Sequence, residues 1–362
     1  MVRWITLFCA LLLGAFQAHA APPSDRILLV VSSHGRDDGR TQPGFEMDEL
    51  SQAWLTFRAN GLAVDIASPA GGAVVADAHD PAKPYNAAFA ADPEAQRKLA
   101  ATLPLSTAMA GQYAAIMVIG GKGAMFDLPF SQVLQSLLVE VEARGGVAAA
   151  VCHGPAVFAR IRNADGSHWI GGRQVTGFAD EEEAMFGKQW VPHFPFLLES
   201  ELRRLGARFS DAPIMLPHVV TDGRIITGQN PFSVAAASDA VVAALGRQPV
   251  PRTPWADERS LGLVARAIAG DTAPLAAALA AGGAETDVPL VAIWGYYRAL
   301  QAKRDPAMLA PALTVMELAQ PHFPEPQLDA AIAEARATLA APCRRPEGQS
   351  GDLPTCDEAD AS

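Results

Sequence analysis

Short apolar runs alternate with amphipathic stretches between residues 26 and 246. The runs predict strands buried on both faces, because they are apolar at consecutive positions rather than at alternate ones. The stretches between them predict helices that end at glycines. Strand–helix alternation is typical of an α/β fold, here a flavodoxin-like doubly wound parallel sheet. The predicted strands cover residues 27–31, 63–67, 114–119 and 147–151, and the clearest helices cover residues 49–60 and 131–144. Residues 70–111 lack this pattern, and we expect them to form an insertion over the sheet.

The pattern changes after the prolines at positions 249, 251 and 254. Residues 249–341 are rich in alanine and predict an all-α appendage, followed by a tail over residues 342–362. Three helices are expected, over Val288–Ala302, Pro306–Ala319 and Pro326–Leu339.

One part of this appendage loosely resembles a tetratricopeptide unit, and a plain helical appendage is the alternative. The similarity rests on Trp294, Tyr296, Tyr297, Ala299, Pro321 and Pro324. Because one such unit cannot bury its own apolar face, we expect it to pack on the catalytic domain or on a second copy of the chain, as in a homodimer.

The first twenty residues have the pattern of a cleaved secretory signal. Arg3 precedes an apolar run from Trp4 to Phe16, and Ala18-His19-Ala20 forms a small-residue cleavage site. An uncleaved anchor is the alternative, although the run is short for a membrane span. We therefore expect a signal peptide over residues 1–20, a catalytic domain over residues 21–248 and a periplasmic protein without membrane association.

The net charge bears on possible binding partners, and the cysteine content bears on disulfides and on a reactive thiol. The net charge of −11 predicts no binding to nucleic acid or anionic lipid, because both would be repelled. Signal cleavage would remove Cys9 and leave Cys152, Cys343 and Cys356. The last two either form a disulfide, which an oxidising compartment permits, or stay free thiols. Cys152 is then the odd cysteine and calls for an explanation.

Cys152 lies between a predicted buried strand and a new helix, in the segment AAAVCHGPA. Gly154 permits a sharp turn and Pro155 suits the first turn of a helix. Such an elbow places a side chain at the carboxyl edge of the sheet, where open α/β folds keep their sites. A helix N-terminus would lower the pKa of the thiol and favour the nucleophilic thiolate. The alternative is a small buried apolar residue.

The segment AVCHGPA resembles the nucleophile elbow of the ThiJ/PfpI superfamily, which is class I glutamine amidotransferase-like. More narrowly it resembles the branch of heat-shock chaperones with glyoxalase III activity. Further segments are similar and occur in the family's order across residues 27–245. They are GFEMDEL at 44–50, ASPAGG at 67–72, GGKGAMFDLP at 120–129, VTGF at 175–178 and DGRIITGQNPFS at 222–233.

The resemblance implies roles for two acids. The family's buried glutamate, poised near the sulfur, falls on Glu49, with Glu46 as a competitor three residues earlier. A carboxyl group beside the thiol would have a raised pKa and would carry a proton. An acid after VTGF orients the histidine next to the nucleophile, here His153. Glu183 aligns best among the four acids 180–183, which otherwise predict a solvated face.

Backbone N–H groups of Gly121 and His153, next to Gly120, are expected to stabilise an oxyanion. The chain departs from the branch at Lys122, where histidine is usual. This change puts the identity of the substrate in question more than the nucleophile. The histidines at positions 34, 79, 168, 193 and 218 have no metal-ligand spacing, so we expect neither a metal nor a cofactor.

Three functions fit this sequence. The first is a lyase of the glutathione-independent glyoxalase or deglycase type, which converts small reactive aldehydes such as methylglyoxal to hydroxy acids such as lactate. The second is an amidase or peptidase with a Cys152–His153–Glu183 triad. The third is a stress chaperone or redox sensor in which Cys152 is oxidised reversibly.

Overall fold

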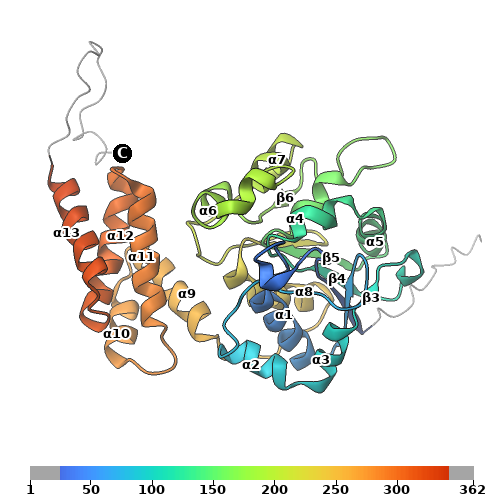
Figure 1. Cartoon of the computed structure of the whole chain (residues 1–362), viewed down its shortest axis with the longest axis horizontal. Coiled ribbons are helices and arrows are strands. Elements are labelled where there is room, and N and C mark those ends of the chain that lie inside the picture. Colours follow the sequence, from blue (N-terminus) through green and yellow to red (C-terminus); the bar gives the residue numbers. More distant parts are fainter. Residues whose placement is uncertain (1–24, 342–362) are drawn as a thin grey trace, which may run out of the picture.

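A computed structural model of the chain describes residues 25–341 (Figure 1). Within this range the main sheet has seven strands in the order β3-β2-β1-β4-β5-β9-β8. Neighbouring strands are parallel except β8, which pairs with β9 in the antiparallel sense. The strands are β1 (Arg26–Val30), β2 (Ala63–Ser68), β3 (Leu103–Pro104), β4 (Ala115–Val118), β5 (Val147–Val151), β8 (Val219–Asp222) and β9 (Ile225–Gly228). The predicted α/β architecture is therefore confirmed. A separate pair of short strands consists of β6 (Gln174–Val175) and β7 (Arg208–Phe209).

Hydrophobic cores lie on both faces of the sheet, because successive strand residues point to opposite sides. In β1, Leu28 and Val30 belong to one core, whereas Ile27 and Leu29 belong to the other. Helices α1 and α8 cover the second face, and α5 and α7 cover the first. The helices of this α/β part are α1 (Met47–Ala59), α2 (Pro84–Ala91), α3 (Pro93–Ala100), α4 (Ala124–Asp127), α5 (Gln132–Ala143), α6 (Asp180–Phe186), α7 (Leu198–Arg204) and α8 (Val234–Ala244).

Several connections contain short 3₁₀ helices, and residues 70–111 contain α2, α3 and β3 rather than irregular chain alone. The 3₁₀ helices are η1 (Asp37–Gly39), η2 (Thr107–Met109), η3 (Leu128–Phe130), η4 (Gly154–Arg160), η5 (Lys188–His193), η6 (Pro231–Ser233) and η7 (Gln320–His322). The helix expected after Cys152 is therefore present, as the 3₁₀ helix η4.

The remaining helices, called here the helical region, lie to one side of the α/β part (Figure 1). They surround a third hydrophobic core in which Trp294 is fully buried. The side chains of Asp287 and Asp305 cap two of these helices, as expected for acids at N-caps. The helices are α9 (Ala256–Ile268), α10 (Ala273–Ala281), α11 (Val288–Ala302), α12 (Pro306–Ala319) and α13 (Pro326–Ala340). The last three agree with the helices expected from the sequence.

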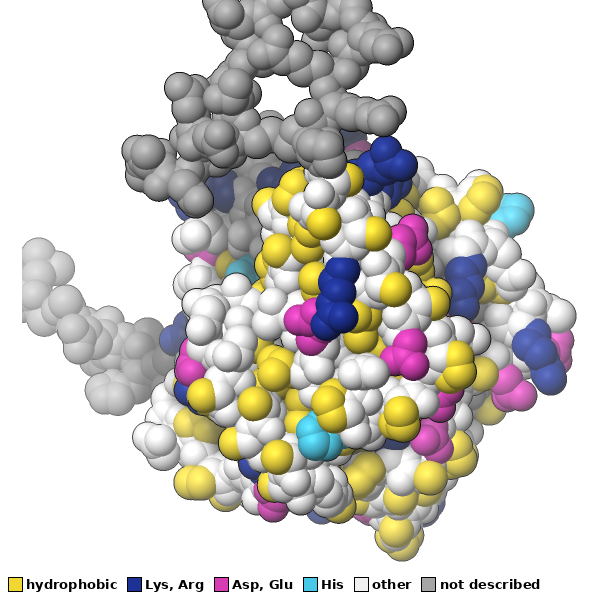
Figure 2. Space-filling model, turned by 90° about the vertical axis from the view of Figure 1, so that its left-hand side faces the viewer, with side chains coloured by type: hydrophobic (Ala, Val, Ile, Leu, Met, Phe, Trp, Pro, Cys, Tyr) yellow, Lys and Arg dark blue, Asp and Glu magenta, His cyan; other side chains and the backbone are white. Residues whose placement is uncertain are grey.

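The helical region packs on the α/β part of the same chain. The indole Nε1–H of Trp294 donates to the carbonyl of Ile214 at 2.8 Å. The Tyr85 hydroxyl lies 2.8 Å from Asp257 Oδ2 on α9. On the outer face of the helical region, hydrophobic side chains are interspersed with charged ones (Figure 2). Homodimer formation and the tetratricopeptide similarity stay predictions.

Several sequence-based expectations lie outside the described residues. These are the signal peptide over 1–20, the tail over 342–362, and the states of Cys9, Cys343 and Cys356. From residue 25 to residue 341, no helix is both long and apolar enough to cross a bilayer.

Candidate active site

Cys152 follows the last residue of β5 and has φ of +56°. A non-glycine residue in this left-handed region is strained by about 1–3 kcal/mol, and such strain is concentrated at functional sites. The backbone N–H of Cys152 donates to the carbonyl of Gly228 at 2.9 Å, which ties the elbow to β9. Its side chain is 3% exposed. The elbow predicted from the sequence is therefore present, and Cys152 lines a pocket.

Gly120, after β4, permits the close approach of two loops at the sulfur. A Cβ atom at Gly120 would lie 2.6 Å from Cys152 Cβ and 2.7 Å from the backbone nitrogen of His153. Such distances are not tolerated, so only glycine fits without a shift of the backbone. The N–H of Gly121 is directed at the Cys152 thiol. The residues predicted to form an oxyanion hole are therefore brought together at the sulfur.

Glu49 lies beside the thiol and Glu46 lines the pocket. Helix α1 begins at Met47 with Glu46 as its N-cap, so Glu49 falls within its first turn. Glu49 is 0% exposed, and its Oε2 accepts the N–H of Gly120 at 2.7 Å. Burial, followed by the charge of Glu46, raises the pKa of Glu49 to about 8, whereas hydrogen bonding to Cys152 opposes that rise. Burial also raises the pKa of Glu46 to about 7.

The environment of Cys152 corrects one expectation. The sequence suggested that a helix N-terminus would lower the pKa of the thiol. In the structure, burial and the charge of Glu49 raise the pKa of Cys152 well above its usual value, although the Gly121 N–H opposes this. Desolvation disfavours a thiolate, and a carboxylate neighbour disfavours it further. The thiol therefore needs a proton acceptor within the site.

His153 lies between Cys152 and Glu183. Its Nδ1 is 3.2 Å from the sulfur, and its Nε2 hydrogen-bonds to Glu183 Oε1. The imidazole stacks on Phe178 with 4.5 Å between ring centroids, which fixes its plane. His153 and Glu183 are 1% and 2% exposed. Glu183 therefore reaches His153 as the resemblance implied, and the alternative of a solvated face is wrong for this residue.

Glu182 is a site residue that the sequence did not single out. Its Oε1 accepts the N–H of Met215 and the amide of Asn230, both at 2.9 Å. Its Oε2 accepts the N–H of Ala179 at 3.3 Å. Because residue 179 is alanine rather than the serine or threonine of a capping box, the sequence carries no such signal for Glu182. Burial raises the pKa of Glu182 to about 7.

These groups line a pocket of about 230 Å³. Glu46, Gly121, Lys122, Cys152 and His153 form its polar side. The rest of the lining consists of Phe178, Glu182, Phe186, Met215, Asn230, Pro231 and Phe232. The charge of Lys122 opposes the rise in the pKa of Glu46, so the two charged groups lie close enough to interact at the pocket.

Candidate metal ligands do not converge. Across residues 25–341, no three His, Cys, Asp or Glu side chains are grouped so as to hold a metal ion. The described part of the chain contains one free cysteine, Cys152. The site thus offers a thiol, an imidazole and several carboxyl groups with raised pKa values, a set suited to covalent addition and proton transfer.

Comparisons with known proteins identify the family of this chain. The model of the DJ-1/PfpI family matches residues 41–244. The glutathione-independent glyoxalase HSP31 of Saccharomyces cerevisiae is 32% identical over 222 residues, which cover 58% of this chain and 92% of that protein. Glyoxalase III from Candida albicans has a similar structure, with a TM-score of 0.55, 27% identity and coverage of 60% of this chain and 96% of that one. The structure of Rapid Encystment Protein 24 KDa from Francisella tularensis is also similar, with a TM-score of 0.56 and 30% identity. The match covers 61% of this chain and 98% of that one. The chain belongs to the DJ-1/PfpI family.

Proposed function

We propose that this chain is a Cys152-dependent, glutathione-independent glyoxalase that converts methylglyoxal and water to lactate. One observation carries the proposal. Glu49, a fully buried carboxyl group with a pKa raised to about 8, lies beside the Cys152 thiol and is fixed by the Gly120 N–H. A carboxyl group in this state can accept and return a proton near neutral pH.

The first step is addition of the thiol to the aldehyde. The sulfur forms a bond with C1 of methylglyoxal while the C1–oxygen π bond breaks. His153, whose Nδ1 lies 3.2 Å from the sulfur, accepts the thiol proton and passes it to the new oxygen. Glu183 bonds the opposite ring nitrogen and supports the transient imidazolium. The product of this step is a hemithioacetal.

The second step moves hydrogen between two carbons. Ionised Glu49 removes the proton from C1. The C–H electron pair forms a C1–C2 double bond while the C2–oxygen π bond breaks, which gives an enediolate. Glu49 then returns this proton to C2, while the C1 hydroxyl proton ends on the C2 oxygen. C1 is oxidised to the acyl level and C2 is reduced to an alcohol, so no external oxidant takes part. In this step the Gly121 N–H, which is directed at the thiol, and Lys122, which lines the pocket, would bind the oxygen atoms.

The third step is hydrolysis of the resulting thioester. Water, activated by His153, adds to the acyl carbon. The carbon–sulfur bond then breaks, the thiol regains a proton and lactate leaves. The names of the HSP31 and glyoxalase III relatives support this reaction class for the present chain.

The test is lactate formation from methylglyoxal by purified protein without glutathione. Cys152→Ser keeps the shape of the site and replaces the nucleophile. We expect lactate from wild type and on the order of a thousandfold less from the variant. Absence of lactate from wild type, or equal rates from both proteins, would contradict the proposal.

A second candidate is a cysteine hydrolase that cleaves amides. The hydrogen-bonded series Cys152–His153–Glu183 favours it, because this is the arrangement of an acyl-transfer triad. A burst of product with an activated ester, together with no lactate from methylglyoxal, would support this alternative.

We also propose that the protein is exported, on the basis of the leader pattern in residues 1–20. Expression of the full chain with a C-terminal tag and N-terminal sequencing of the periplasmic fraction is the test. A mature N-terminus at Ala21 is expected, and full-length protein retained in the cytoplasm would refute export.

A further inference from the structure

The active-site pocket lies where two hydrophobic cores meet. Cys152 and Phe178 belong to the core of the α/β part. Three residues on another side of the pocket, Phe186, Met215 and Phe232, are called here the apolar wall. Met215 is a member of the helical region's core, Phe232 packs against that core, and Phe186 packs against both cores. The helical region therefore contacts all three residues of the apolar wall, and the α/β core supports Phe186 as well.

The loop that carries Met215 is held from both sides. On one side Trp294 of α11 donates its indole N–H to the carbonyl of Ile214, the preceding residue. On the other side the N–H of Met215 donates to Glu182 at 2.9 Å. Met215 has φ of +62°, which a non-glycine residue keeps only where its surroundings enforce it. These two bonds enforce the conformation, and they place the Met215 side chain at the pocket.

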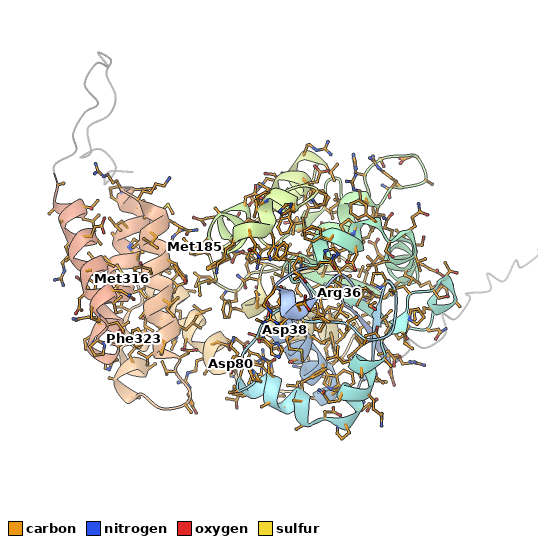
Figure 3. All side chains as sticks on the ribbon, in the orientation of Figure 1. Arg36, Asp38, Asp80, Met185, Met316 and Phe323 are labelled. Carbon is orange, nitrogen blue, oxygen red and sulfur yellow. The ribbon has the colours of Figure 1, made fainter. Side chains whose placement is uncertain are left out.

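Helix α6, which carries Phe186, is also fixed by α11. The ring of Tyr297 meets the ring of Phe186 edge-on, with 5.5 Å between centroids. Arg298 pairs with Glu181 Oε1 at 2.6 Å, and Gln301 donates to the Glu181 carbonyl at 3.1 Å. Met185, also on α6, lies where this helix faces the helical region (Figure 3). Glu182 and Glu183 follow Glu181, so α11 fixes the position of the acid that bonds His153.

The pocket lining thus combines reactive polar groups with the apolar wall. Cys152, His153 and Lys122 would bind the two carbonyl groups of a 2-oxoaldehyde. Its remaining substituent would then lie against the apolar wall. The methyl group of methylglyoxal covers little of such a surface, whereas a phenyl group would displace water from much more of it.

Resting on the function proposed above, we infer that the helical region determines substrate specificity, and that the site prefers 2-oxoaldehydes with aromatic or large aliphatic substituents. The residues that match the family model end at 244, before α9 begins at Ala256. The contribution of α11 to the pocket thus comes from outside the matched residues. Tyr297 acts here as a positioning residue, because it touches Phe186 and does not line the pocket.

Two neighbouring tyrosines provide a matched test. Tyr297→Leu removes the ring that supports Phe186. Tyr296→Leu makes the same change one residue earlier, at a side chain that lines a separate cavity between α11 and α13. The Tyr296 ring touches that of Tyr297, with 5.9 Å between centroids, and its removal leaves the Tyr297 ring against Phe186. The measurement is kcat/KM for phenylglyoxal and for methylglyoxal in wild type and both variants. Turnover of methylglyoxal by each variant shows that it is folded.

Wild type is expected to prefer phenylglyoxal by about tenfold or more, the range for additional apolar contacts in a pocket. Tyr297→Leu should reduce this preference by about fivefold, mainly through a higher KM for phenylglyoxal. Tyr296→Leu should keep the wild-type ratio. Equal ratios in the two variants, or no preference in wild type, would overturn the inference.

A second measurement does not depend on turnover. Alkylation of Cys152 by iodoacetamide and by N-phenylmaleimide can be followed by mass spectrometry of the Cys152 peptide. The ratio of aromatic to small-reagent rates should fall in Tyr297→Leu alone. If that ratio falls while no 2-oxoaldehyde is converted, the proposed reaction fails and the role of the helical region stands. If lactate forms but the ratio is the same in all three proteins, the reaction stands and the specificity inference fails.

Discussion

The α/β part and the helical region differ in what they bury. Around Cys152 the α/β part buries Glu49, Glu182 and Glu183, each at most 2% exposed. In the described helical region the buried carboxyl group is Asp257, which faces Tyr85 of the α/β part. Burying a carboxylate costs free energy. Hydrogen bonds to these groups, or a proton kept on them, reduce that cost. The buried carboxyl groups around Cys152 therefore reduce the stability of the α/β part. The helical region instead contributes apolar packing against the pocket.

The largest expected effect is on catalysis by the α/β part. Glu49→Gln keeps the shape of the side chain but removes its capacity to accept a proton. We expect kcat for methylglyoxal to fall by about 10²–10⁴-fold, the usual contribution of a general base. In the wild-type protein, kcat should rise as the pH increases through about 8, because Glu49 must be ionised to accept a proton. Wild-type-like kcat in this variant would exclude Glu49 from proton transfer.

The next effect concerns stability against pH. The pKa of Glu49 is raised in the folded state, from 4.5 to about 8, so the folded protein binds the proton more tightly than the unfolded chain. Its stabilising contribution is complete below pH 4.5 and is lost as pH rises through 8. At about 1.4 kcal/mol per pKa unit, the loss amounts to a few kcal/mol.

Urea unfolding at pH 5 and pH 9 checks this contribution. Wild type should lose more free energy of unfolding than Glu49→Gln between these two values. Glu334→Gln, at an exposed position on α13, is the control and should behave as wild type. Parallel curves for wild type and Glu49→Gln would refute the raised pKa.

Two glycines sharpen the contrast at the level of packing. At Gly120 an added Cβ would overlap Cys152, whereas at Gly262 on α9 it would meet nothing within 4 Å. Gly120→Ala should therefore cost about 1–3 kcal/mol and depress activity. Gly262→Ala should stabilise by about 0.5–1 kcal/mol, because alanine favours a helix. Thermal unfolding of both variants measures these changes in stability. A Gly120→Ala variant as stable as wild type would contradict the close approach at the sulfur.

The smallest effect is expected at the junction of the two parts. The Tyr85 hydroxyl contacts Asp48 and Asp257, so Tyr85→Phe leaves two buried carboxyl groups without it. Because Asp48 and Asp257 keep other hydrogen bonds, a net cost of about 0.5–1.5 kcal/mol is expected, with faster hydrogen exchange in α9. Tyr113→Phe removes a similar bond, to Asp65, within the α/β part. It should leave α9 unchanged, and equal exchange of α9 in both variants would argue against the Tyr85 junction.

Much of the fold could be predicted because its signals are local. The apolar run at 147–151 coincides with β5, and α11 and α12 begin where an aspartate caps and a proline follows. Cys152 and His153 were identified from the elbow between strand and helix. Glu49 and Glu183 came from the family resemblance, since nothing local places them at the sulfur.

Other features depend on contacts between distant segments. Glu182 meets Met215 and Asn230, and Phe186 meets Tyr297, only after the loops fold over the sheet. The sequence carries little signal for such pairs. The direction of the Cys152 pKa was wrong for the same reason. A helix can be predicted from the local sequence. The burial that raises this pKa most depends on the packing of the whole fold.

The most direct measurement is the initial rate of lactate formation from methylglyoxal, without glutathione, by wild type and Cys152→Ala at equal concentrations. If the buried thiol performs the addition, wild type forms lactate and the variant, which retains Glu49 and His153, forms none above the uncatalysed rate. Equal rates in the two proteins would show that the sulfur takes no part in the reaction.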